Sequence, residues 1–499
     1  MPPSQPSPHR PRRRSVNLGF WSWALLGTAA GFCLAAELPT EIDKALRLHK
    51  IESDDLSLYL REVTETSPRL AFNTGVARTP ASTIKLLTTI AALDRLGPNY
   101  RWHTRAYVGG PLVDGRLAGD LIIRGGGDPS LRPQDLWRFL WEMRARGLGT
   151  VSGDLVIDNS AFEPPETTRD AFDGKALDPY NALPVAFAVN FQATQIEVLP
   201  EPSTRSLRAY LVPPLANVTL VNQARLVEAP CRSKHHRLNL AVHQTGPATN
   251  LTLTGSFASE CGQDSISRLL LDPVSHAGDA VRALWEGLGG TISGGVREGT
   301  VPNGATLFHT LDSDELALVV RDINKWSNNL MTRTLFLTLG MERFGRPATL
   351  AKGRTAVRDW LTEQGLDFPE LVIDNGSGLS RETRISAGSL GRLLSWAYSN
   401  PEMSELTASL PIIGVDGTLH GRFRRDALRG QAHLKTGTLR GATGLAGFVD
   451  DAAGRRWILV SFINNPRLQG WRGKAVEDAI LRWVYAGAPW ETKATQAPR

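Results

Sequence analysis

Apolar positions near the N-terminal end of the chain change from helical spacing to strand spacing and back. A helix is predicted over residues 38–50, with Thr40 as its N-cap, and a strand over 56–60, where leucines alternate with other residues. A short strand around 70–72 follows. Ser82 then opens a segment whose apolar residues fall on one helical face, and a Gly-Pro pair ends it. The sequence therefore places Ser82 in the first turn of a mostly buried helix.

Between about residues 99 and 302 the pattern changes to short strands separated by Gly and Pro clusters. The strands predicted there are 121–123, 154–157, 195–198, 238–242 and 251–253. This stretch is predicted to be a β-rich insertion.

Helical spacing returns after residue 314, and strands follow it. The helices predicted are 316–339, 350–364 and 386–399. Strands are predicted at 433–439, 444–449 and 457–462, and a closing helix at 474–485. The last two strands are joined by a turn typical of a hairpin. The early helix and the late strands thus belong to one α/β domain that the insertion interrupts.

The first 36 residues have the pattern of an export signal. Four arginines precede an apolar stretch at 18–34, and Ala35-Ala36 offers a small-residue cleavage site. We expect an exported, periplasmic protein that is soluble or weakly membrane-associated. An uncleaved membrane anchor is the alternative, although this stretch is short for a membrane span and contains glycines.

Charge and cysteine content fit an exported enzyme. Removing the four N-terminal arginines from the net charge of +6 leaves +2, which gives no reason to expect a nucleic-acid partner. Cys231 and Cys261 remain after cleavage, and two thiols can pair in an oxidising compartment. No cofactor or metal is expected. The glycines at 125–127 lack the lysine of a phosphate-binding loop, and His235, His236 and His243 lack a metal-ligand pattern.

Three short motifs carry the candidate chemistry. In chain order they are Ser82-Thr83-Ile84-Lys85, Ser327-Asn328-Asn329 and Lys435-Thr436-Gly437. They match the S-x-x-K, S-x-N and K-T-G patterns of penicillin-binding proteins and class A β-lactamases. The first two patterns arise easily by chance and the third less often, but one opens an apolar helix, one precedes a helical run and one lies in a predicted strand. This context indicates a single site.

Nucleophilic catalysis explains why these residue types occur at this spacing. A serine hydroxyl is a weak nucleophile that needs an adjacent base, and Lys85 lies one helical turn from Ser82. A buried lysine near another cation, here Lys435, loses its proton readily, so neutral Lys85 can take the Ser82 proton. Ser327 can relay a proton to the leaving amine, and Asn329 can orient the substrate.

The third motif suits a substrate carboxylate and an oxyanion. Lys435, Thr436 and Thr438, together with Gly437 in the strand, form the predicted carboxylate-binding site. Backbone N–H groups of Ser82 and Thr438 are the expected oxyanion donors.

Longer strings extend the likeness to a known family. They are 80–88, 117–121, 125–129, 179–182, 374–381, 434–439 and 445–448. On these residues the chain resembles the class C low-molecular-mass penicillin-binding proteins, the D-alanyl-D-alanine carboxypeptidase/endopeptidase family of the penicillin-binding protein 4 type. The resemblance implies a serine-type DD-peptidase that cleaves D-Ala-D-Ala bonds and D-Ala-diamino-acid crosslinks through an acyl-enzyme on Ser82. The implied partners are peptidoglycan peptides and β-lactam inhibitors, with a homodimer left open.

The resemblance also implies a domain plan. The fold is α/β: a penicillin-binding/β-lactamase-like transpeptidase domain, an antiparallel sheet with flanking helices, interrupted by two β-rich inserted domains. The expected boundaries are 1–36 for the signal peptide, 37–98 and 303–499 for the catalytic domain, 99–165 and 250–302 for inserted domain II, and 166–249 for inserted domain III.

Two further residues are expected to recognise the diamino acid of the substrate. In the family an inserted domain and a loop after the middle helices form a pocket beside the nucleophile. The matching loop here is 374–381, in which Arg381 would pair with a carboxylate. Asp158 would pair with the substrate's ammonium. A surface arginine and a turn-capping aspartate are the structural alternatives.

Two other functions remain open at this point. A serine β-lactamase shares the nucleophile chemistry, but it hydrolyses its acyl-enzyme fast and lacks the long insertion. A non-catalytic wall-binding protein would keep the fold, but the intact Ser82, Lys85, Ser327 and Lys435 argue against it.

Overall fold

The computed structural model describes residues 37–489, apart from 202, 232–236, 247 and 402. The expected signal peptide, including the apolar stretch at 18–34, lies outside the described residues, as do His235 and His236. None of the helices within the described part is long and apolar enough to cross a membrane.

The domain formed by the two ends of the chain is built on an antiparallel five-stranded sheet with the order β2-β1-β23-β22-β21. Its strands are β1 (Leu56–Glu62), β2 (Leu70–Phe72), β21 (Ala432–Leu439), β22 (Ala442–Asp450) and β23 (Arg456–Asn464). The strands predicted near both ends of the chain therefore join in one sheet, as expected. β21, which carries the third motif, is an edge strand and leaves one side open beside the Ser82 turn.

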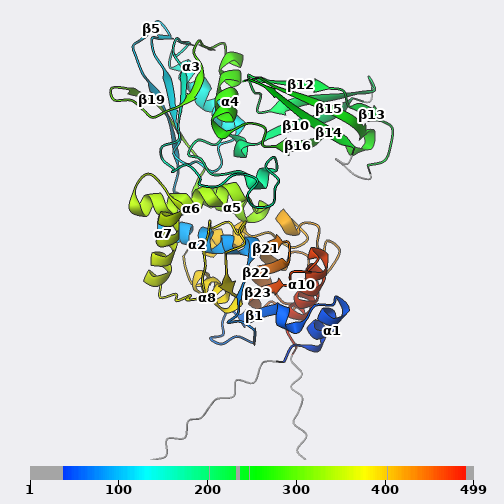
Figure 1. Cartoon of the computed structure of the whole chain (residues 1–499). Coiled ribbons are helices and arrows are strands. Elements are labelled where there is room, and N and C mark those ends of the chain that lie inside the picture. Colours follow the sequence, from blue (N-terminus) through cyan, green and yellow to red (C-terminus); the bar gives the residue numbers. More distant parts are fainter. Residues whose placement is uncertain (1–36, 202, 232–236, 247, 402, 490–499) are drawn as a thin grey trace, which may run out of the picture. The chain divides into compact units, whose positions relative to one another are not determined.

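Helices flank this sheet. The first and last are α1 (Thr40–Leu48) and α10 (Gly470–Tyr485), which pack on each other, with α10 also against β22. α8 (Ala387–Tyr398) packs against β1 and β23, and Figure 1 shows the sheet between α8 and α10. The predicted N-cap Thr40 is wrong: the cap is Pro39, because Thr40 already lies inside the helix.

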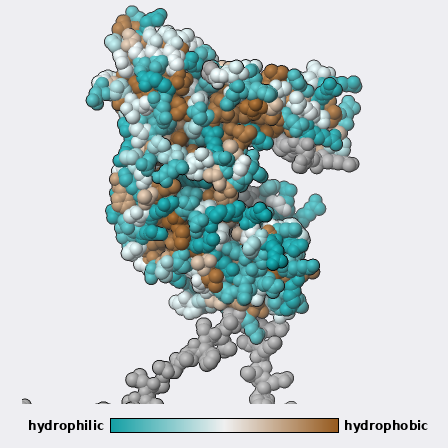
Figure 2. All heavy atoms as spheres, in the orientation of Figure 1, coloured by the Kyte–Doolittle hydropathy of each residue, from teal (hydrophilic) through white to brown (hydrophobic). Residues whose placement is uncertain are grey.

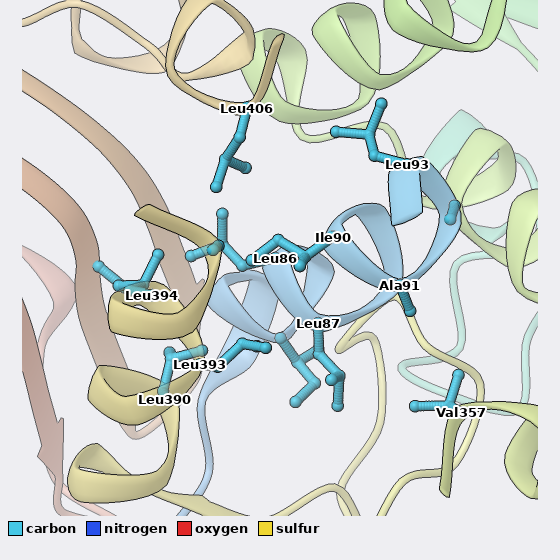
Figure 3. Packing of buried hydrophobic residues seen from close by; sticks show 14 of the residues in the cluster. Leu86, Leu87, Ile90, Ala91, Leu93, Val357, Leu390, Leu393, Leu394 and Leu406 are labelled. Atoms are coloured by element: carbon cyan, nitrogen blue, oxygen red, sulfur yellow. The ribbon is translucent and has the colours of Figure 1, made fainter. Parts of the chain in front are cut away.

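The helix that follows Ser82 lies in the centre of this domain's hydrophobic core. α2 (Lys85–Leu96) is buried along most of its length. Leu86, Leu87 and Ile90 pack among side chains of α8 and of α7 (Leu350–Glu363), as Figure 3 shows. Burial of large aliphatic side chains stabilises by about 1.5–3 kcal/mol each. Ser82 therefore directly precedes a rigid, buried element.

A long helical run was predicted over 316–339, and this prediction is wrong in one respect. Two helices occur, α5 (Leu316–Trp326) and α6 (Asn329–Phe344). The break falls at Ser327, which takes a left-handed conformation with φ 60° and ends α5. Asn328 then caps α6 by accepting from the backbone N–H of Met331.

The first part of the insertion is a mixed layer of strands and helices. A five-stranded sheet has the order β18-β9-β7-β4-β19, and a smaller one the order β17-β8-β6-β5. The strands are β4 (His103–Val108), β5 (Leu112–Val113), β6 (Arg116–Leu117), β7 (Leu121–Arg124), β8 (Thr150–Val151), β9 (Leu155–Asp158), β17 (Thr291–Ile292), β18 (Val296–Glu298) and β19 (Thr306–Asp312). Two helices that the sequence analysis missed, α3 (Pro133–Ala145) and α4 (Pro273–Gly287), contribute to its core.

The second part of the insertion is a β unit. Its sheets have the orders β11-β10-β16 and β12-β15-β13, with β14 paired to β15. The strands are β10 (Thr194–Glu201), β11 (Ser206–Val212), β12 (Val218–Asn222), β13 (Arg225–Val227), β14 (Leu238–Thr245), β15 (Ala248–Ala258) and β16 (Asp264–Arg268). Two predicted domain boundaries differ from this strand pairing. β15 and β16 pair with strands of the second part, although the boundary at 249/250 assigned β16 and most of β15 to the first. β19 pairs with β4 of the first part, although the boundary at 302/303 assigned it to the domain formed by the chain ends.

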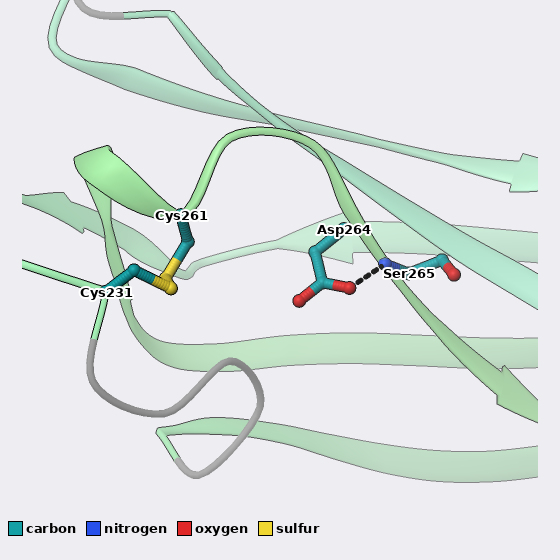
Figure 4. Close-up of a disulfide and its surroundings, with 4 residues drawn as sticks. All are labelled: Cys231, Cys261, Asp264 and Ser265. Carbon is teal, nitrogen blue, oxygen red and sulfur yellow. Dashed lines mark hydrogen bonds between the residues drawn. A yellow bond between two sulfur atoms is a disulfide. The ribbon is translucent and has the colours of Figure 1, made fainter. Parts of the chain in front are cut away.

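The predicted disulfide is present. Cys231, beyond the end of β13, is bonded to Cys261, in a short turn after β15, and the bond closes a loop with a sequence separation of 30 residues (Figure 4).

Elsewhere in the described chain, short elements complete the fold: β3 (Ala77–Arg78) pairs with β20 (Ile385–Ser386), and α9 (Met403–Ser409) packs on α5. Hydrophilic residues cover much of the face drawn in Figure 2.

Candidate active site

Ser82 lies in a tight turn that precedes α2. The turn, η2 (Ala81–Ile84), is a 3₁₀ segment, and Ala81 has a positive φ of 47°. At two glycines, other segments of the chain pass close to this turn. A Cβ on Gly437 would lie 2.7 Å from the Pro80 carbonyl oxygen, and one on Gly378 would overlap the Ala81 carbonyl. The third motif and the loop around 376–378 are thus packed directly against the Ser82 turn.

The Lys85 side chain is fully buried and faces three acceptors. Its Nζ lies 3.1 Å from Ser82 Oγ and 2.7 Å from Asn329 Oδ1, and it also donates to the backbone carbonyl of Ser377. The Ser377 carbonyl can only accept a hydrogen bond, and so can the amide oxygen of Asn329. Once Lys85 is neutral, its two remaining N–H bonds serve these acceptors. Its lone pair must then face Ser82, which is the arrangement a general base requires.

Electrostatics favour that neutral state. The pKa of Lys85 lies well below its ordinary value, first because burial disfavours the charge and then because of the positive charges of Lys435 and Arg333. The predicted effect of Lys435 on Lys85 is therefore present. Arg333, on α6, is a second cation that the sequence analysis did not identify, although it follows Asn329 by one helical turn.

The second motif is positioned by the break between α5 and α6. Asn329 is the first residue of α6, and its amide points in two directions: Oδ1 accepts from Lys85, while Nδ2 donates to the backbone carbonyl of Tyr180 over 3.2 Å. The left-handed turn at Ser327 brings its hydroxyl to Lys435, whose Nζ donates to Ser327 Oγ over 2.9 Å.

Lys435, the first residue of the third motif, is buried on β21. Burial lowers the pKa of Lys435 to about 7. Next to it, the hydroxyl of Thr436 is hydrogen-bonded to that of Thr418 over 2.9 Å, and Thr438 is exposed. Below pH 7, where Lys435 is protonated, the strand presents an ammonium together with hydroxyls and edge backbone groups, which suit a carboxylate and an oxyanion.

The two residues predicted to recognise the diamino acid lie in different surroundings. Arg381 is exposed; its guanidinium stacks over the ring of Phe172 at 4.7 Å and donates to the carbonyl of Arg440. Asp158 is only 1% exposed. Its Oδ1 accepts from the backbone N–H of Ser160, and its Oδ2 accepts from that of Val301 and lies 3.6 Å from Arg124 Nε. The geometry thus leaves Arg381 accessible and gives Asp158 partners within the fold. Substrate binding by either residue stays a prediction.

Other functional groups escaped the sequence analysis because they are backbone atoms. The carbonyls of Ser377 and Tyr180 touch the Lys85–Asn329 pair, and no residue type marks such a role. The cluster of the described residues therefore combines all three predicted motifs with groups from the insertion and from the loop at 374–381.

The chain matches a known protein family. Residues 38–486 match the D-Ala-D-Ala carboxypeptidase 3 (S13) family. The chain belongs to this family. Membership supports a hydrolase of the carboxypeptidase class and confirms the resemblance to penicillin-binding protein 4 found in the sequence.

Relatives of this S13 family member are similar over most of their length. A D-alanyl-D-alanine carboxypeptidase of Actinomadura sp. (strain R39) is 29% identical over 96% of this chain and 93% of its own. The carboxypeptidase DacB of Mycolicibacterium smegmatis is 30% identical over 91% and 87%. The D-alanyl-D-alanine carboxypeptidase DacB of Haemophilus influenzae is 25% identical over 83% and 86%.

The fold agrees with a solved structure. The crystal structure of penicillin-binding protein 4 (dacB) from Haemophilus influenzae superposes with a TM-score of 0.71 at 23% identity, covering 89% of this chain and 99% of that one. The predicted α/β fold class, with its inserted domains, is confirmed.

Proposed function

We propose that this S13 family member is a serine-type DD-peptidase that acts on peptidoglycan peptides through an acyl-enzyme on Ser82. The observation that carries the proposal is the environment of Lys85. Two of its three partners can only accept hydrogen bonds, so its lone pair is directed at the hydroxyl of Ser82.

The reaction then proceeds in two stages. Neutral Lys85 takes the Ser82 proton as Oγ bonds to the carbonyl carbon of the D-Ala residue. Backbone N–H groups of Ser82 and Thr438 stabilise the oxyanion. The C–N bond breaks, the leaving amine takes a proton relayed through Ser327, and the acyl group stays on Ser82 as an ester. Water hydrolyses this ester and restores the serine.

Substrate binding uses the third motif. The ammonium of Lys435, with the hydroxyls of Thr436 and Thr438 beside Gly437, binds the carboxylate at the end of the leaving residue. The same acyl transfer cleaves a terminal D-Ala-D-Ala bond or a D-Ala-diamino-acid crosslink, since both are amides of D-alanine. A β-lactam that presents a carboxylate and a strained amide acylates the same serine.

The diamino acid is recognised beside this site. Arg381 binds the side-chain carboxylate of the diamino acid. Asp158 is assigned its ammonium, which would replace the backbone N–H partners at Ser160 and Val301. A side chain with both charges suits this pair, which points to meso-diaminopimelate over lysine. Because these are wall peptides, the enzyme works in the periplasm after export by the segment 1–36. Whether the protein forms a homodimer is left open, and sedimentation of the mature protein tests it.

Digestion of purified muropeptides tests the proposal. The mature protein is incubated with uncrosslinked pentapeptide and with crosslinked dimers, and products are read by mass. Loss of one D-alanine from the pentapeptide supports the carboxypeptidase, and conversion of dimers to monomers supports the endopeptidase. If neither substrate is cleaved while a labelled penicillin turns over within seconds, the β-lactamase alternative is correct. If neither substrate nor penicillin reacts, the protein is the non-catalytic alternative.

A further inference from the structure

Residues 172–182 of the insertion, named the strap here, reach the catalytic side chains of α6. The backbone carbonyl of Tyr180 accepts from Asn329 Nδ2 over 3.2 Å. The carbonyl of Ala182 accepts from Arg333 Nη1 over 3.0 Å. At the other end of the strap the Phe172 ring lies under the Arg381 guanidinium. The strap thus touches the second motif, a cation that acts on Lys85, and the arginine predicted to bind the diamino acid.

One carboxylate holds the strap in shape. Asp173 accepts from the hydroxyl of Tyr180 over 2.6 Å, from Asn181 Nδ2 over 2.8 Å and from the backbone N–H of Lys175 over 3.2 Å. Asn181 is buried, and its amide also donates to the Lys175 carbonyl. Because Asp173 binds the side chains of two consecutive residues, it fixes the direction of the Tyr180 carbonyl between them.

That carbonyl decides which end of the Asn329 amide faces Lys85. An amide has an accepting oxygen and a donating nitrogen, and a rotation of 180° about its last bond exchanges them. The Tyr180 carbonyl can only accept, so it holds the nitrogen and leaves the oxygen for Lys85. With the amide reversed, its N–H would donate to the lone pair of neutral Lys85. The hydroxyl of Ser82 would then compete with Asn329 for that lone pair.

We propose that Asp173 is a positioning residue for the reaction: through Tyr180 it orients the Asn329 amide so that Lys85 serves Ser82 alone. Asp173 acts from the insertion and touches none of the reacting atoms. The proposal rests on the acyl-enzyme mechanism given above. It assigns the insertion a part in the chemistry, in addition to any part in substrate recognition.

The test compares Asp173→Ala with the wild type in the rate of acylation by a fluorescent penicillin across pH. The rate should rise with pH as Lys85 loses its proton, under the influence of the charges that face it, Lys435 on β21 and Arg333 on α6. In Asp173→Ala we expect a plateau lower by about 10- to 100-fold, as for other small misplacements of catalytic groups. The pH of half-maximal rate should fall, because an N–H facing Lys85 disfavours its ammonium form.

Three further variants distinguish a positioning role of Asp173 from a purely structural one. Asp173→Asn retains an accepting oxygen and should recover part of the rate, and Tyr180→Phe, which lacks only the hydroxyl, should lose an intermediate amount. Asp170→Ala is the matched control: this exposed carboxylate lies just before the strap and interacts with Thr168, so its loss should leave the rate unchanged. A purely structural role for Asp173 would lower the melting temperature and the fraction of titratable sites without moving the pH profile, and that result overturns the proposal.

A crystal structure of Asp173→Ala decides the same point without acylation. The Tyr180 carbonyl should leave hydrogen-bonding distance of Asn329 Nδ2; retention of that contact overturns the proposal. If the wild type itself is not acylated, the mechanism on Ser82 fails, whereas the structure of the variant still reports on the strap.

Discussion

The side chain of Lys435 donates a hydrogen bond to Ser327 Oγ over 2.9 Å, and Ser327 is the residue at which α5 ends. This contact joins the second and third motifs across the site. It also depends on an uncommon backbone conformation, the left-handed φ of 60° at a non-glycine residue. The strained turn and the buried cation therefore hold one another in place.

Burial of Lys435 predicts a pH-dependent stability. Its pKa is lowered to about 7 in the folded protein, whereas an unfolded lysine titrates near pH 10.4. Between these values the unfolded chain binds a proton that the folded chain does not, so the free energy of unfolding rises with pH across this window. Below pH 7 the destabilising contribution of Lys435 is at its maximum and constant.

Substitution of Lys435 by methionine should remove this contribution. We expect Lys435→Met to be inactive but more stable than the wild type at pH 7 by about 1–3 kcal/mol, less at pH 10. Chemical denaturation at both pH values measures the difference, with exposed Lys474→Met as the control. Equal stabilities of Lys435→Met and wild type at pH 7 would contradict the buried, proton-losing lysine.

Arg333 is predicted to tune the base. Its buried guanidinium opposes the ammonium form of Lys85, so Arg333→Met should raise the pKa of Lys85. The acid limb of the acylation profile should move to higher pH, by about 0.5–1 unit. Arg343→Met, an exposed position on the same helix, is the control. A limb that stays in place would show that Lys435 and burial alone set this pKa.

Arg381 is predicted to read a carboxylate of the diamino acid. Two peptides that differ only in that carboxylate are compared by kcat/KM, and the wild type should prefer the peptide that carries it. Arg381→Ala should erase most of the preference, by roughly 1.5–3 kcal/mol, whereas exposed Arg358→Ala on α7 should not. If the wild type treats both peptides alike, the pocket assignment is wrong and the Ser82 chemistry stands.

Asp158 requires a companion measurement because it is buried and has partners on both oxygens. Asp158→Asn should lower the free energy of unfolding by about 1–3 kcal/mol, because one of the two backbone N–H groups loses its acceptor and faces the amide NH2 instead. A role with the substrate's ammonium would add a fall in kcat/KM for peptides that carry the ammonium over those that lack it. Without that difference, Asp158 is structural.

The Cys231–Cys261 bond is predicted to stabilise the second part of the insertion. Closing a loop of this length contributes roughly 3 kcal/mol in the chain-entropy account. The double variant Cys231→Ser/Cys261→Ser should therefore unfold at lower denaturant, while its rate with a short peptide stays near that of the wild type. Two reactive thiols in the unfolded, unreduced wild type would rule the bond out.

Periodicity accounts for what the sequence predicted well. The strands β1 and β21–β23 and the helix after Ser82 have regular apolar spacing, and the three motifs are defined by residue type at short range. The helices α3 and α4 were missed because the surrounding strands dominated the pattern, although Pro133 and Asp272-Pro273 are helix-start signals.

Conformation accounts for what could not be predicted. The break at Ser327 comes from one positive φ within a helical pattern, and no glycine or proline marks it. The Ser377 and Tyr180 carbonyls act through backbone position, which residue type does not encode. Sheet partners such as β4 and β19 are set by long-range pairing, so the boundaries inside the insertion were the least predictable feature.

The proposed function requires that Ser82 is acylated with Lys85 as its base. The most direct measurement incubates the mature protein with a penicillin, digests it, and locates the added mass by peptide mass spectrometry. We predict a single adduct on Ser82, absent in Ser82→Ala, nearly absent in Lys85→Ala because the pair acts as a unit, and undiminished in the control Ser399→Ala. An adduct that persists in a folded Ser82→Ala protein, or that maps to another residue, would contradict the account.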